Sequence, residues 1–305
     1  MSLYQKYRPK SLDQIKGNKE TVLKLQNMLS KKESFPHAVL LYGETGCGKT
    51  TIARIIANEL GCIGSDLYEY DSSQFRGIDT SRDIHYKSQF LASEGKIRVW
   101  ILDECHKMTN DAQNALLKIL EDTPDHVYFI LCTTDPIKLI SAVKGRCSQF
   151  QVYPISNDEM FSLLRRIVRS EKQELKQEVF DQIILSANGL PRNAIQILEQ
   201  VLSVPDDERL SIAKVTVERQ HQVIELCRAL IKRNSWKQVK AILVSIKEED
   251  PENIRRVVLG YMQSVLLGNE DDMAAAIIEA FWEPTYNIGF PGIVYACYSI
   301  INLKR

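Results

Sequence analysis

The first half of the chain alternates short apolar runs with longer stretches in which apolar residues recur at helical spacing. The apolar runs are rich in Val, Ile, Leu and aromatic residues, which is typical of strands buried on both faces of a sheet. They cover Ala38–Tyr42, Leu67–Asp71, Ile97–Leu102, Val127–Cys132 and Gln149–Tyr153. Helical patterns such as Thr50–Leu60 and Ala112–Leu120 lie between them. This alternation predicts an α/β fold with a parallel five-stranded sheet covered by helices.

After Pro154 the strand signals give way to helical ones. Ser156 and Glu159 stand three residues apart before an apolar run, which predicts a capping box at a helix N-terminus. Two further helical stretches cover Gln177–Ala187 and Pro191–Ser203. This part of the chain is therefore predicted to be a small three-helix domain.

The Pro- and Asp-containing segment Val204–Arg209 is expected to interrupt the helices again. Five more helical patterns follow, over 216–234, 236–246, 251–267, 270–282 and 291–303. We therefore predict three domains: an α/β nucleotide-binding domain over 1–153, a three-helix domain over 154–213 and an all-α C-terminal domain over 214–305.

A phosphate-binding pattern, G-x-x-x-x-G-K-[ST], is matched without a departure by Gly43-Glu44-Thr45-Gly46-Cys47-Gly48-Lys49-Thr50. A predicted strand precedes the loop, and a predicted helix that continues with Thr51 follows it. The glycines let backbone N–H groups point at phosphate oxygens, and the helix N-terminus adds partial positive charge. Lys49 would neutralise the β- and γ-phosphates, and the Thr50 hydroxyl would bind Mg²⁺. The sequence therefore predicts a site for ATP and Mg²⁺.

Two acidic residues, Asp103 and Glu104, end the apolar run Val99–Leu102. Ligands of parallel sheets bind at the carboxyl ends of the strands, where this pair is expected to lie. Asp103 would hold Mg²⁺, and Glu104 would act as general base toward the attacking water. Taken alone, the pair has an equally good interpretation as an exposed acidic strand end; beside a complete phosphate loop, the catalytic interpretation is favoured.

The next apolar run along the chain ends in Thr133-Thr134-Asp135. A hydroxyl at this strand end would lie beside the acidic pair and position the hydrolytic water. Taken alone, threonines that follow a strand are more often turn residues.

Composition narrows the choice of function further. Lys plus Arg and Asp plus Glu number 39 each, so any DNA-binding surface must be local. The seven cysteines include no C-x-x-C pair, which favours reduced thiols over disulfides or a zinc site. Cys47 in the loop is interpreted as a small tolerated side chain, the alternative being a thiol of lowered pKa.

No apolar run reaches the roughly 18 residues of a membrane span, and no apolar signal region opens the chain. A cytoplasmic location (the host cytoplasm for a viral protein) is therefore expected.

Several motifs in register resemble the AAA+ clamp-loader ATPases, a family that includes bacterial gamma/tau subunits and replication factor C small subunits. The matching segments are Lys6–Gly17, Asp103–Met108, Asn114–Glu121, Thr133–Pro136 and Gly189–Ala194. The resemblance covers about residues 1–205. It implies an AAA+ P-loop domain, a helical lid and, for the C-terminal third, a helical collar.

The resemblance also assigns roles to single residues. It implies that Tyr7, Arg8 and Pro9 border the adenine and that Arg192 reaches the γ-phosphate. It favours Thr134 as the residue that senses the nucleotide.

A further arginine, Arg146, resembles the residue that the family inserts into the ATP site of the neighbouring subunit. From the residues alone it is a turn arginine after Leu139–Val143, and a solvated surface position would be the preferred interpretation. The family usually has Ser-Arg-Cys at this place, whereas this chain has Gly145-Arg146-Cys147. The arginine is kept although the serine is lost. The chain also departs from the gamma/tau subunits in having only Cys62 where they carry a four-cysteine zinc module.

These features predict an ATP-hydrolysing subunit of a sliding-clamp loader, which opens the clamp and places it on primer–template DNA. The implied partners are the clamp, the DNA and other loader subunits, the same or different chains, in a pentameric ring; no membrane partner is expected. The resemblance implies that helix N-termini face the DNA, so DNA contact is expected around Gln74–Lys87, with Arg76, Arg82 and Lys87, and around the next helix start, with Lys107, Asn110 and Gln113. An ordinary charged helix face is the alternative for any one of these residues.

Two other functions remain open at this stage. One is a different DNA-directed AAA+ ATPase, such as a branch-migration helicase or a helicase loader, against which the predicted collar and the Gly145-Arg146-Cys147 spacing argue. The other is a structural loader subunit that does not hydrolyse ATP. The presence of Lys49, Thr50, Asp103 and Glu104 argues against that alternative.

Overall fold

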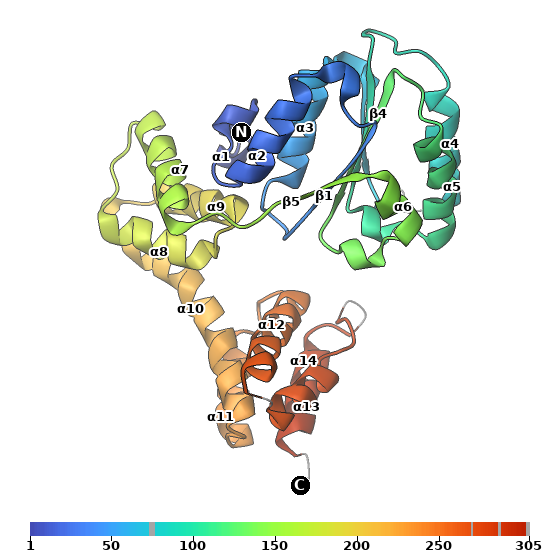
Figure 1. The fold of residues 1–305 in the computed structure, drawn as a ribbon. Coiled ribbons are helices and arrows are strands. Elements are labelled where there is room, and N and C mark those ends of the chain that lie inside the picture. Colours follow the sequence, from blue (N-terminus) through green and yellow to red (C-terminus); the bar gives the residue numbers. More distant parts are fainter. Residues whose placement is uncertain (73–76, 270, 286–287, 303–305) are drawn as a thin grey trace. The chain divides into compact units, whose positions relative to one another are not determined.

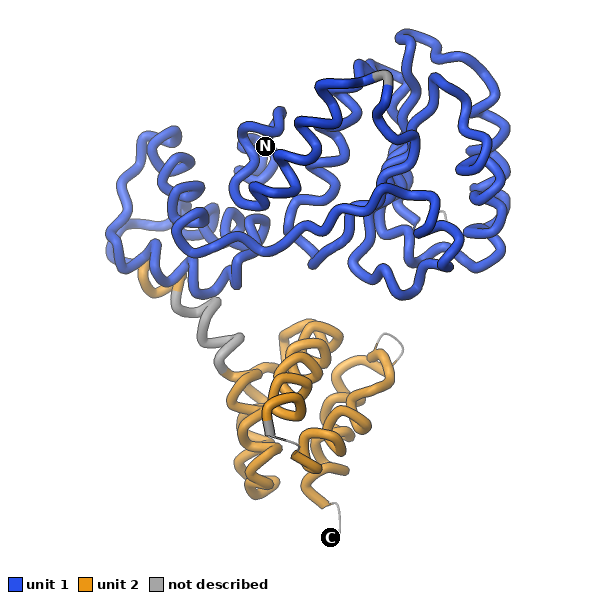
Figure 2. The backbone as a smooth tube through the Cα atoms, in the orientation of Figure 1, with its two compact units in different colours: residues 1–209 blue, residues 210–305 orange. Residues whose placement is uncertain are grey.

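The computed structural model describes residues 1–72, 77–269, 271–285 and 288–302, apart from the side chains of Glu33, 214–221 and Asn269. The chain divides into two compact units, Met1–Arg209 and Leu210–Arg305 (Figures 1 and 2). The first unit contains a sheet and the helices around it, followed by three helices. In the second unit, the regular structure of the described residues is helical.

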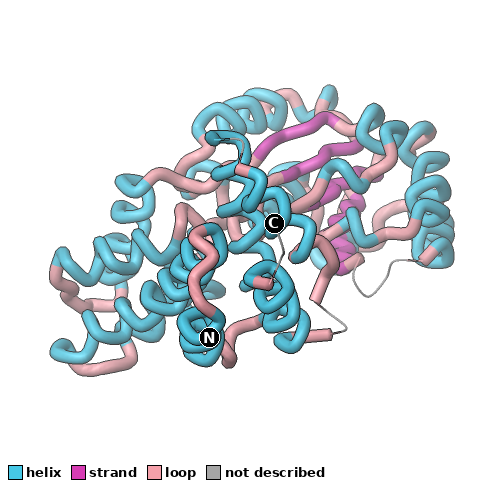
Figure 3. Tube along the Cα trace, turned by 90° about the horizontal axis from the view of Figure 1, so that it is seen from below, coloured by secondary structure: helices cyan, strands magenta, loops and turns pink. Residues whose placement is uncertain are grey.

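The first unit is built on a parallel five-stranded sheet, as predicted (Figure 3). Its strands are β1 Ala38–Tyr42, β2 Leu67–Asp71, β3 Arg98–Asp103, β4 Val127–Thr133 and β5 Ser148–Gln151. The order across the sheet is β2-β3-β4-β1-β5, and every neighbouring pair is parallel. The carboxyl ends of β1, β3 and β4 therefore lie together at one edge.

Burial differs between the central and the outer strands. The central strands β1, β3 and β4 are buried along almost their whole length. The outer strands β2 and β5 are only partly buried. The prediction that all five are buried on both faces is therefore wrong for β2 and β5, because an edge strand has a neighbour on one side only.

Helices cover both faces of the sheet (Figure 1). Alternate residues of one strand point to opposite faces, so Val99 and Ile101 join the core under α2 and α3, while Trp100 and Leu102 join the core under α4, α5 and α6. These helices are α2 Lys19–Leu29, α3 Lys49–Leu60, α4 Ile78–Ser88, α5 Asn110–Glu121 and α6 Ser141–Arg146, and a short helix, α1 Leu3–Lys6, precedes them. The two cores anchor the strand ends on which the site residues lie.

Three helices follow the sheet, at the predicted places. They are α7 Asn157–Ser170, α8 Gln177–Ala187 and α9 Pro191–Leu202. The capping box at the start of α7 is confirmed: the Ser156 hydroxyl accepts from the Glu159 N–H, and the Glu159 carboxylate accepts from the Ser156 N–H. We refer to these three helices as the lid.

The next helix differs from the prediction. The segment around Pro205 interrupts the helices as predicted, because α9 ends at Leu202, but α10 then covers Asp206–Ile231 and so begins before the predicted range 216–234. Proline is tolerated at a helix start, where its missing N–H has no intrahelical partner, and the acidic residues Asp206, Asp207 and Glu208 suit the first turn. The segment therefore begins a helix. The division into domains at 153/154 and 213/214 stays a prediction.

The described residues of the second unit form four more helices, close to the predicted ranges: α11 Trp236–Ser245, α12 Pro251–Asn269, α13 Asp272–Ala280 and α14 Phe290–Ile301. Apolar side chains from α10 to α14 form one core, with Leu226, Val258 and Cys297 fully buried. Within the ranges described above, no helix combines the length and the hydrophobicity that crossing a bilayer requires.

The buried carboxylate of Glu252 links two segments of the second unit by hydrogen bonds. Glu252 on α12 is 6% exposed and accepts hydrogen bonds from Arg255 and from the backbone N–H and hydroxyl of Thr285. Arg255 also donates to the carbonyl oxygens of Phe281 and Trp282. The Arg255 bonds, helped by those from Thr285 and opposed by burial, lower the pKa of Glu252 to about 2.

A Glu252→Gln variant should therefore lose stability in a way that depends on pH. Because the folded pKa lies below the ordinary 4.5, the ionised group stabilises the fold above pH 4.5, and this contribution disappears as the pH falls toward 2. We expect the variant to be less stable than the parent by about 2–3 kcal/mol at pH 7, and the gap to narrow in acid. Urea unfolding at pH 7 and pH 3 measures this gap, with exposed Glu248→Gln as the control. A gap that does not change with pH would contradict the assignment.

Candidate nucleotide-binding site

The phosphate loop, residues 43–50, joins β1 to α3 and turns on three glycines. Gly43, Gly46 and Gly48 all have positive φ angles (152°, 87° and 104°), which other residues rarely adopt. A Cβ atom on Gly43 would lie 2.0 Å from the carbonyl oxygen of Val152, so only glycine fits there. The last two residues of this segment, Lys49 and Thr50, already belong to α3, which begins at Lys49.

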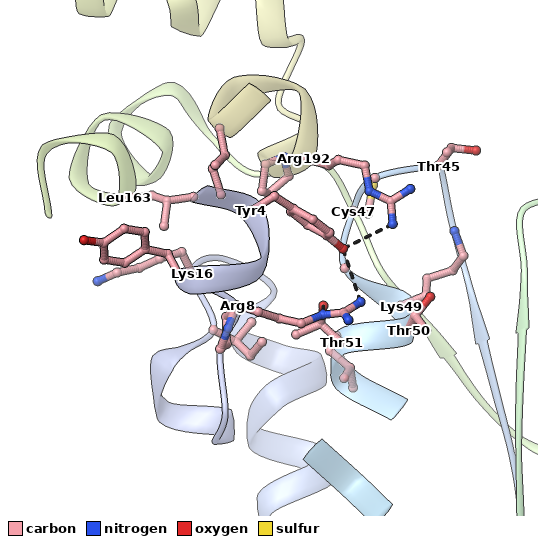
Figure 4. A pocket seen from close by; sticks show the side chains of 18 of the residues that line it. Tyr4, Arg8, Lys16, Thr45, Cys47, Lys49, Thr50, Thr51, Leu163 and Arg192 are labelled. Carbon is pink, nitrogen blue, oxygen red and sulfur yellow. Dashed lines mark hydrogen bonds between the residues drawn. The ribbon is translucent and has the colours of Figure 1, made fainter. Parts of the chain in front are cut away.

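The Lys49 ammonium is buried against this loop. Its side chain lies at the N-terminus of α3, next to Thr50 (Figure 4), and the residue is 5% exposed. The ammonium donates hydrogen bonds to the carbonyl oxygens of Gly43 (2.8 Å) and Glu44 (2.9 Å). A fixed positive charge and a helix N-terminus thus face the same place, and both favour an anion.

The carboxylate of Asp103 meets this helix from the end of β3. The Thr50 hydroxyl donates a 2.6 Å hydrogen bond to its Oδ2 atom, and the Glu104 backbone N–H donates to Oδ1 at 2.9 Å. The two predicted Mg²⁺ ligands are therefore adjacent, although 53 positions separate them. Carboxylate and hydroxyl oxygens are hard donors that suit Mg²⁺, which usually takes few protein ligands and completes its shell with phosphate and water. The residues present fit that ion.

Glu104 has an unusual backbone conformation. Its φ angle is 51°, in the left-handed region, where a residue with a side chain is held only by its surroundings. Its Oε2 atom lies 3.5 Å from Nε2 of His106 and 3.6 Å from Nζ of Lys107. The acidic pair is thus split, with Asp103 turned to Thr50 and Glu104 turned to His106.

A pocket opens in front of these residues (Figure 4). Most of the predicted site residues line it: Tyr7, Arg8, Pro9, Thr45, Gly46, Cys47, Gly48, Lys49, Thr50, Thr51, Asp103, Glu104 and Arg192. Leu163, Pro191 and Ile195 of the lid complete the wall, as do Gln14, Ile15 and Lys16. Gly43, Glu44, Thr134 and Arg146 lie outside this lining. The pocket therefore lies between the phosphate loop, the N-terminal segment and the lid.

Tyr4 is a site residue that the sequence interpretation missed. Its phenol oxygen accepts hydrogen bonds from Arg8 and Arg192, each at 3.2 Å, and both guanidinium groups lie over its ring (Figure 4). Burial raises the pKa of Tyr4, but the two arginines together outweigh burial and lower it below its ordinary value. The available signal was an aromatic residue only four positions before Arg8 in the sequence.

The segment around Tyr4 also links the lid to the phosphate-loop helix. Leu3 donates its backbone N–H to Glu199 of α9, and the Lys6 ammonium pairs with Glu171 at the end of α7. Arg8 donates to the Thr51 hydroxyl on α3 at 3.0 Å. A displacement of the lid would therefore strain contacts that reach the start of α3.

Arg192 is positioned by the turn before it. Gly189 has a φ angle of 74°, and a Cβ atom there would lie 2.8 Å from Pro154 and Ile155. Pro191 then occupies the first turn of α9, as predicted, and Arg192 follows it at the pocket. The turn brings a lid arginine to the phosphate loop, with Arg192 packed near Gly46.

Arg146 lies away from this pocket. The residue was expected in a turn, but it is the last residue of α6, where it pairs with Glu121 and donates to the Ala142 carbonyl oxygen. Thr134 directly follows β4, whose last residue, Thr133, is fully buried. The structure of this one chain brings neither Arg146 nor Thr134 into the pocket, and their roles stay predictions.

The structure also decides between the two interpretations of Cys47. Burial raises the pKa of Cys47 to about 11, so the alternative of a lowered pKa is wrong.

The residues expected to contact DNA differ in exposure. Gln113 is 2% exposed and donates to the Met108 carbonyl oxygen, so it is unavailable to DNA. Arg82 and Lys87 lie on α4, each paired with an aspartate one turn away. Lys107 and Asn110 are exposed, whereas Gln74 and Arg76 lie outside the described residues.

Comparison with known proteins identifies relatives over much of the chain. A family model described as DNA polymerase III, delta subunit, matches residues 65–156. The DNA polymerase III subunit tau of Bacillus subtilis is 32% identical over 68% of this chain and 40% of its own length. The replication factor C small subunit of Staphylothermus marinus is 30% identical over 84% of this chain and 75% of its own length. The chain thus spans about two fifths of the length of that bacterial relative.

A solved structure, the Thermotoga maritima RuvB Holliday junction branch migration motor, shares the fold. Its TM-score is 0.60, with 23% identity over 74% of this chain and 79% of that one. The parallel sheet, the phosphate loop, the acidic strand end and the lid define a P-loop protein of the AAA+ class. Within that class, this chain belongs to the clamp-loader ATPase family of DNA polymerase III gamma/tau subunits and replication factor C small subunits.

Proposed function

We propose that the chain is an ATP-hydrolysing subunit of a sliding-clamp loader, which opens the clamp and places it on primer–template DNA. The observation that carries the proposal is the 2.6 Å bond between Thr50 and Asp103 beside the buried Lys49 ammonium. This bond joins the phosphate loop to the acidic strand end, which supports one triphosphate site formed by both. The names of the relatives supply the clamp-loading context.

In this proposal the protein side chains divide the work of hydrolysis. Lys49 neutralises phosphate charge, and Glu104 accepts a proton from the attacking water. Thr50 and Asp103 would hold Mg²⁺, which when bound screens charge on the phosphates. Thr134 would orient the water.

The remaining predicted residues act on the two ends of the nucleotide. Tyr7, Arg8 and Pro9 would border the adenine, and Arg192 would reach the γ-phosphate from the lid. Arg146 would act in the site of a neighbouring subunit, because it lies away from the pocket of its own chain. Loss of the γ-phosphate would remove the contacts of both arginines and so loosen the lid and the subunit seam.

The proposed partners are other loader subunits in a pentamer, the clamp and primer–template DNA. The helices of 214–305 would form the collar through which the subunits assemble. The proposed DNA surface includes Lys107 and Asn110, which are exposed around the start of α5. A cytoplasmic location stays a prediction.

The proposal is tested by reconstitution with candidate loader subunits, a ring-shaped clamp, primed DNA and ATP. We expect ATP-dependent retention of the clamp, followed by its transfer to DNA and ATP turnover. Strand displacement without a clamp would instead favour a branch-migration motor, and clamp transfer without turnover would favour a structural subunit.

Lys49→Ala should weaken nucleotide binding by about 10- to 100-fold, because it removes charge-assisted hydrogen bonds to phosphate. Equilibrium binding of a fluorescent ATP analogue measures this loss. Lys24→Ala is the control, because Lys24 is an exposed lysine on α2 paired only with Glu20 among the described contacts. Equal affinity of the Lys49→Ala variant and the parent would refute the assigned site.

A further inference from the structure

A largely buried histidine connects the acidic pair to the neighbouring strand. His106 follows Glu104 in the short helical turn Cys105–Lys107, and its side chain is 10% exposed. Its Nδ1 atom lies 3.0 Å from the hydroxyl oxygen of Thr133, the last residue of β4. Its Nε2 atom lies 3.5 Å from Oε2 of Glu104. One imidazole ring therefore spans the carboxyl ends of β3 and β4.

The partners of Thr133 determine which ring nitrogen carries the proton. The Thr133 oxygen already accepts the backbone N–H of Asp135 at 3.0 Å, and the residue is fully buried. Its own proton needs an acceptor, and His106 Nδ1 is the acceptor that the described residues offer. A histidine whose Nδ1 accepts has its proton on Nε2 when neutral. The nitrogen that then carries the proton, Nε2, lies 3.5 Å from Oε2 of Glu104.

The charge state of the ring agrees with this arrangement. Burial lowers the pKa of His106, and the nearby Lys107 and Lys138 ammonium groups lower it further, against the opposing effect of Glu104 and Asp135. A neutral imidazole has one N–H, and the Thr133 bond leaves it on Nε2, the nitrogen that lies 3.5 Å from the Glu104 carboxylate. Lys107 reaches the same Oε2 atom from solvent, at 3.6 Å, with a side chain that is 45% exposed.

We propose that His106, held by Thr133, is a positioning residue that fixes the orientation of the Glu104 carboxylate. The inference rests on the proposed role of Glu104 as the base for ATP hydrolysis. A general base acts only within hydrogen-bond reach of the proton it removes, so a loosely held carboxylate loses turnover without losing nucleotide. The two threonines at the end of β4 would then differ in role, since Thr133 reaches Glu104 through His106 and Thr134 does not share that contact.

The test uses two amides that each reproduce one side of the imidazole. In His106→Gln the amide nitrogen can occupy the Nε2 position and donate to Glu104, whereas in His106→Asn it lies near Nδ1 and reaches only Thr133. We expect His106→Asn to lower kcat by about 10-fold or more with unchanged nucleotide affinity, and His106→Gln to retain most of the turnover. His126→Asn is the matched control, because that histidine bonds the Phe90 carbonyl oxygen outside the pocket.

A second pair of variants tests the Thr133 contact. Thr133→Val keeps the shape of the side chain but removes the hydroxyl, and it should lower kcat. Thr133→Ser keeps the hydroxyl, and its kcat should stay near that of the parent. In a Glu104→Gln background, His106→Asn should cause no further loss, because the group that it positions has been removed.

The outcomes separate the two proposals. Equal turnover of the two His106 variants, or an unchanged kcat in Thr133→Val, would overturn the positioning role while leaving clamp-loader function intact. A parent protein without ATP turnover in any reconstituted assembly would overturn the proposed function itself. Matched unfolding temperatures of the Asn and Gln variants exclude a difference in folding as the cause.

Discussion

Arg146→Ala should slow ATP hydrolysis by the assembled loader about 10³-fold or more, while the isolated chain binds nucleotide as before. The reason is that an arginine supplied to a neighbour's site stabilises charge that develops only in the transition state. Arg146 sits at the end of α6, away from the pocket of its own chain, so its removal leaves that pocket intact. Steady-state turnover with clamp and primed DNA, set beside equilibrium nucleotide binding, measures the split.

Two controls decide whether the arginine acts between subunits. Lys144→Ala removes a positive charge from the same helix and should leave turnover unchanged. In an assembly with adjacent copies, mixing Arg146→Ala with Lys49→Ala chains should restore part of the activity. The Lys49 variant then supplies its Arg146 to an intact phosphate loop. A mixture as inactive as its components, or an Arg146→Ala loader with normal turnover, would refute the role in trans.

Glu104→Gln should lower turnover by about 10²–10⁴-fold without weakening nucleotide binding, because an amide keeps the shape of the side chain but cannot accept the proton of water. The left-handed backbone of Glu104 makes glutamine the suitable replacement, since it adds no new bulk at a constrained position. Single-turnover hydrolysis and the dissociation constant for ATP, measured on the same preparation, test both halves of the expectation.

The exposed Glu20→Gln on α2 is the matched control, and we expect it to behave like the parent. If Glu104→Gln hydrolyses ATP at the parent rate, another group is the base. If it fails to bind nucleotide, Glu104 has a structural role, and the division of labour with Asp103 is wrong.

Local patterns predicted most of the fold for a physical reason. A central strand such as β4 is apolar along its length because both faces are covered, and the glycines of the phosphate loop are needed wherever the chain must turn with positive φ. These constraints act within a few residues, so the strand over 38–42 and the α8 range were predicted without error. The start of α10 was missed because proline and aspartate are common in loops and in first helical turns alike.

Contacts between distant segments needed the structure. Tyr4 lies between Arg8 and Arg192 only because α1 packs on helix α9 of the lid. Arg192 is 188 positions away from Tyr4 along the chain. Gln113 looked available on a helix start but is buried by the segment around Ile140, whose backbone N–H it accepts. No spacing rule links such partners, since their separation depends on how the helices pack.

From its residues alone, the chain can be recognised as one that folds into a parallel sheet with a loop for a triphosphate and acids at the end of a strand. Backbone geometry and hydrophobic alternation are local, and they leave their mark in neighbouring positions. Packing decided the rest: that Asp103 turns to Thr50 and Glu104 to His106, and that the His106 ring contacts the buried hydroxyl of Thr133. Such orientations arise from several strands and turns meeting at one edge, where each buried polar group must find a partner.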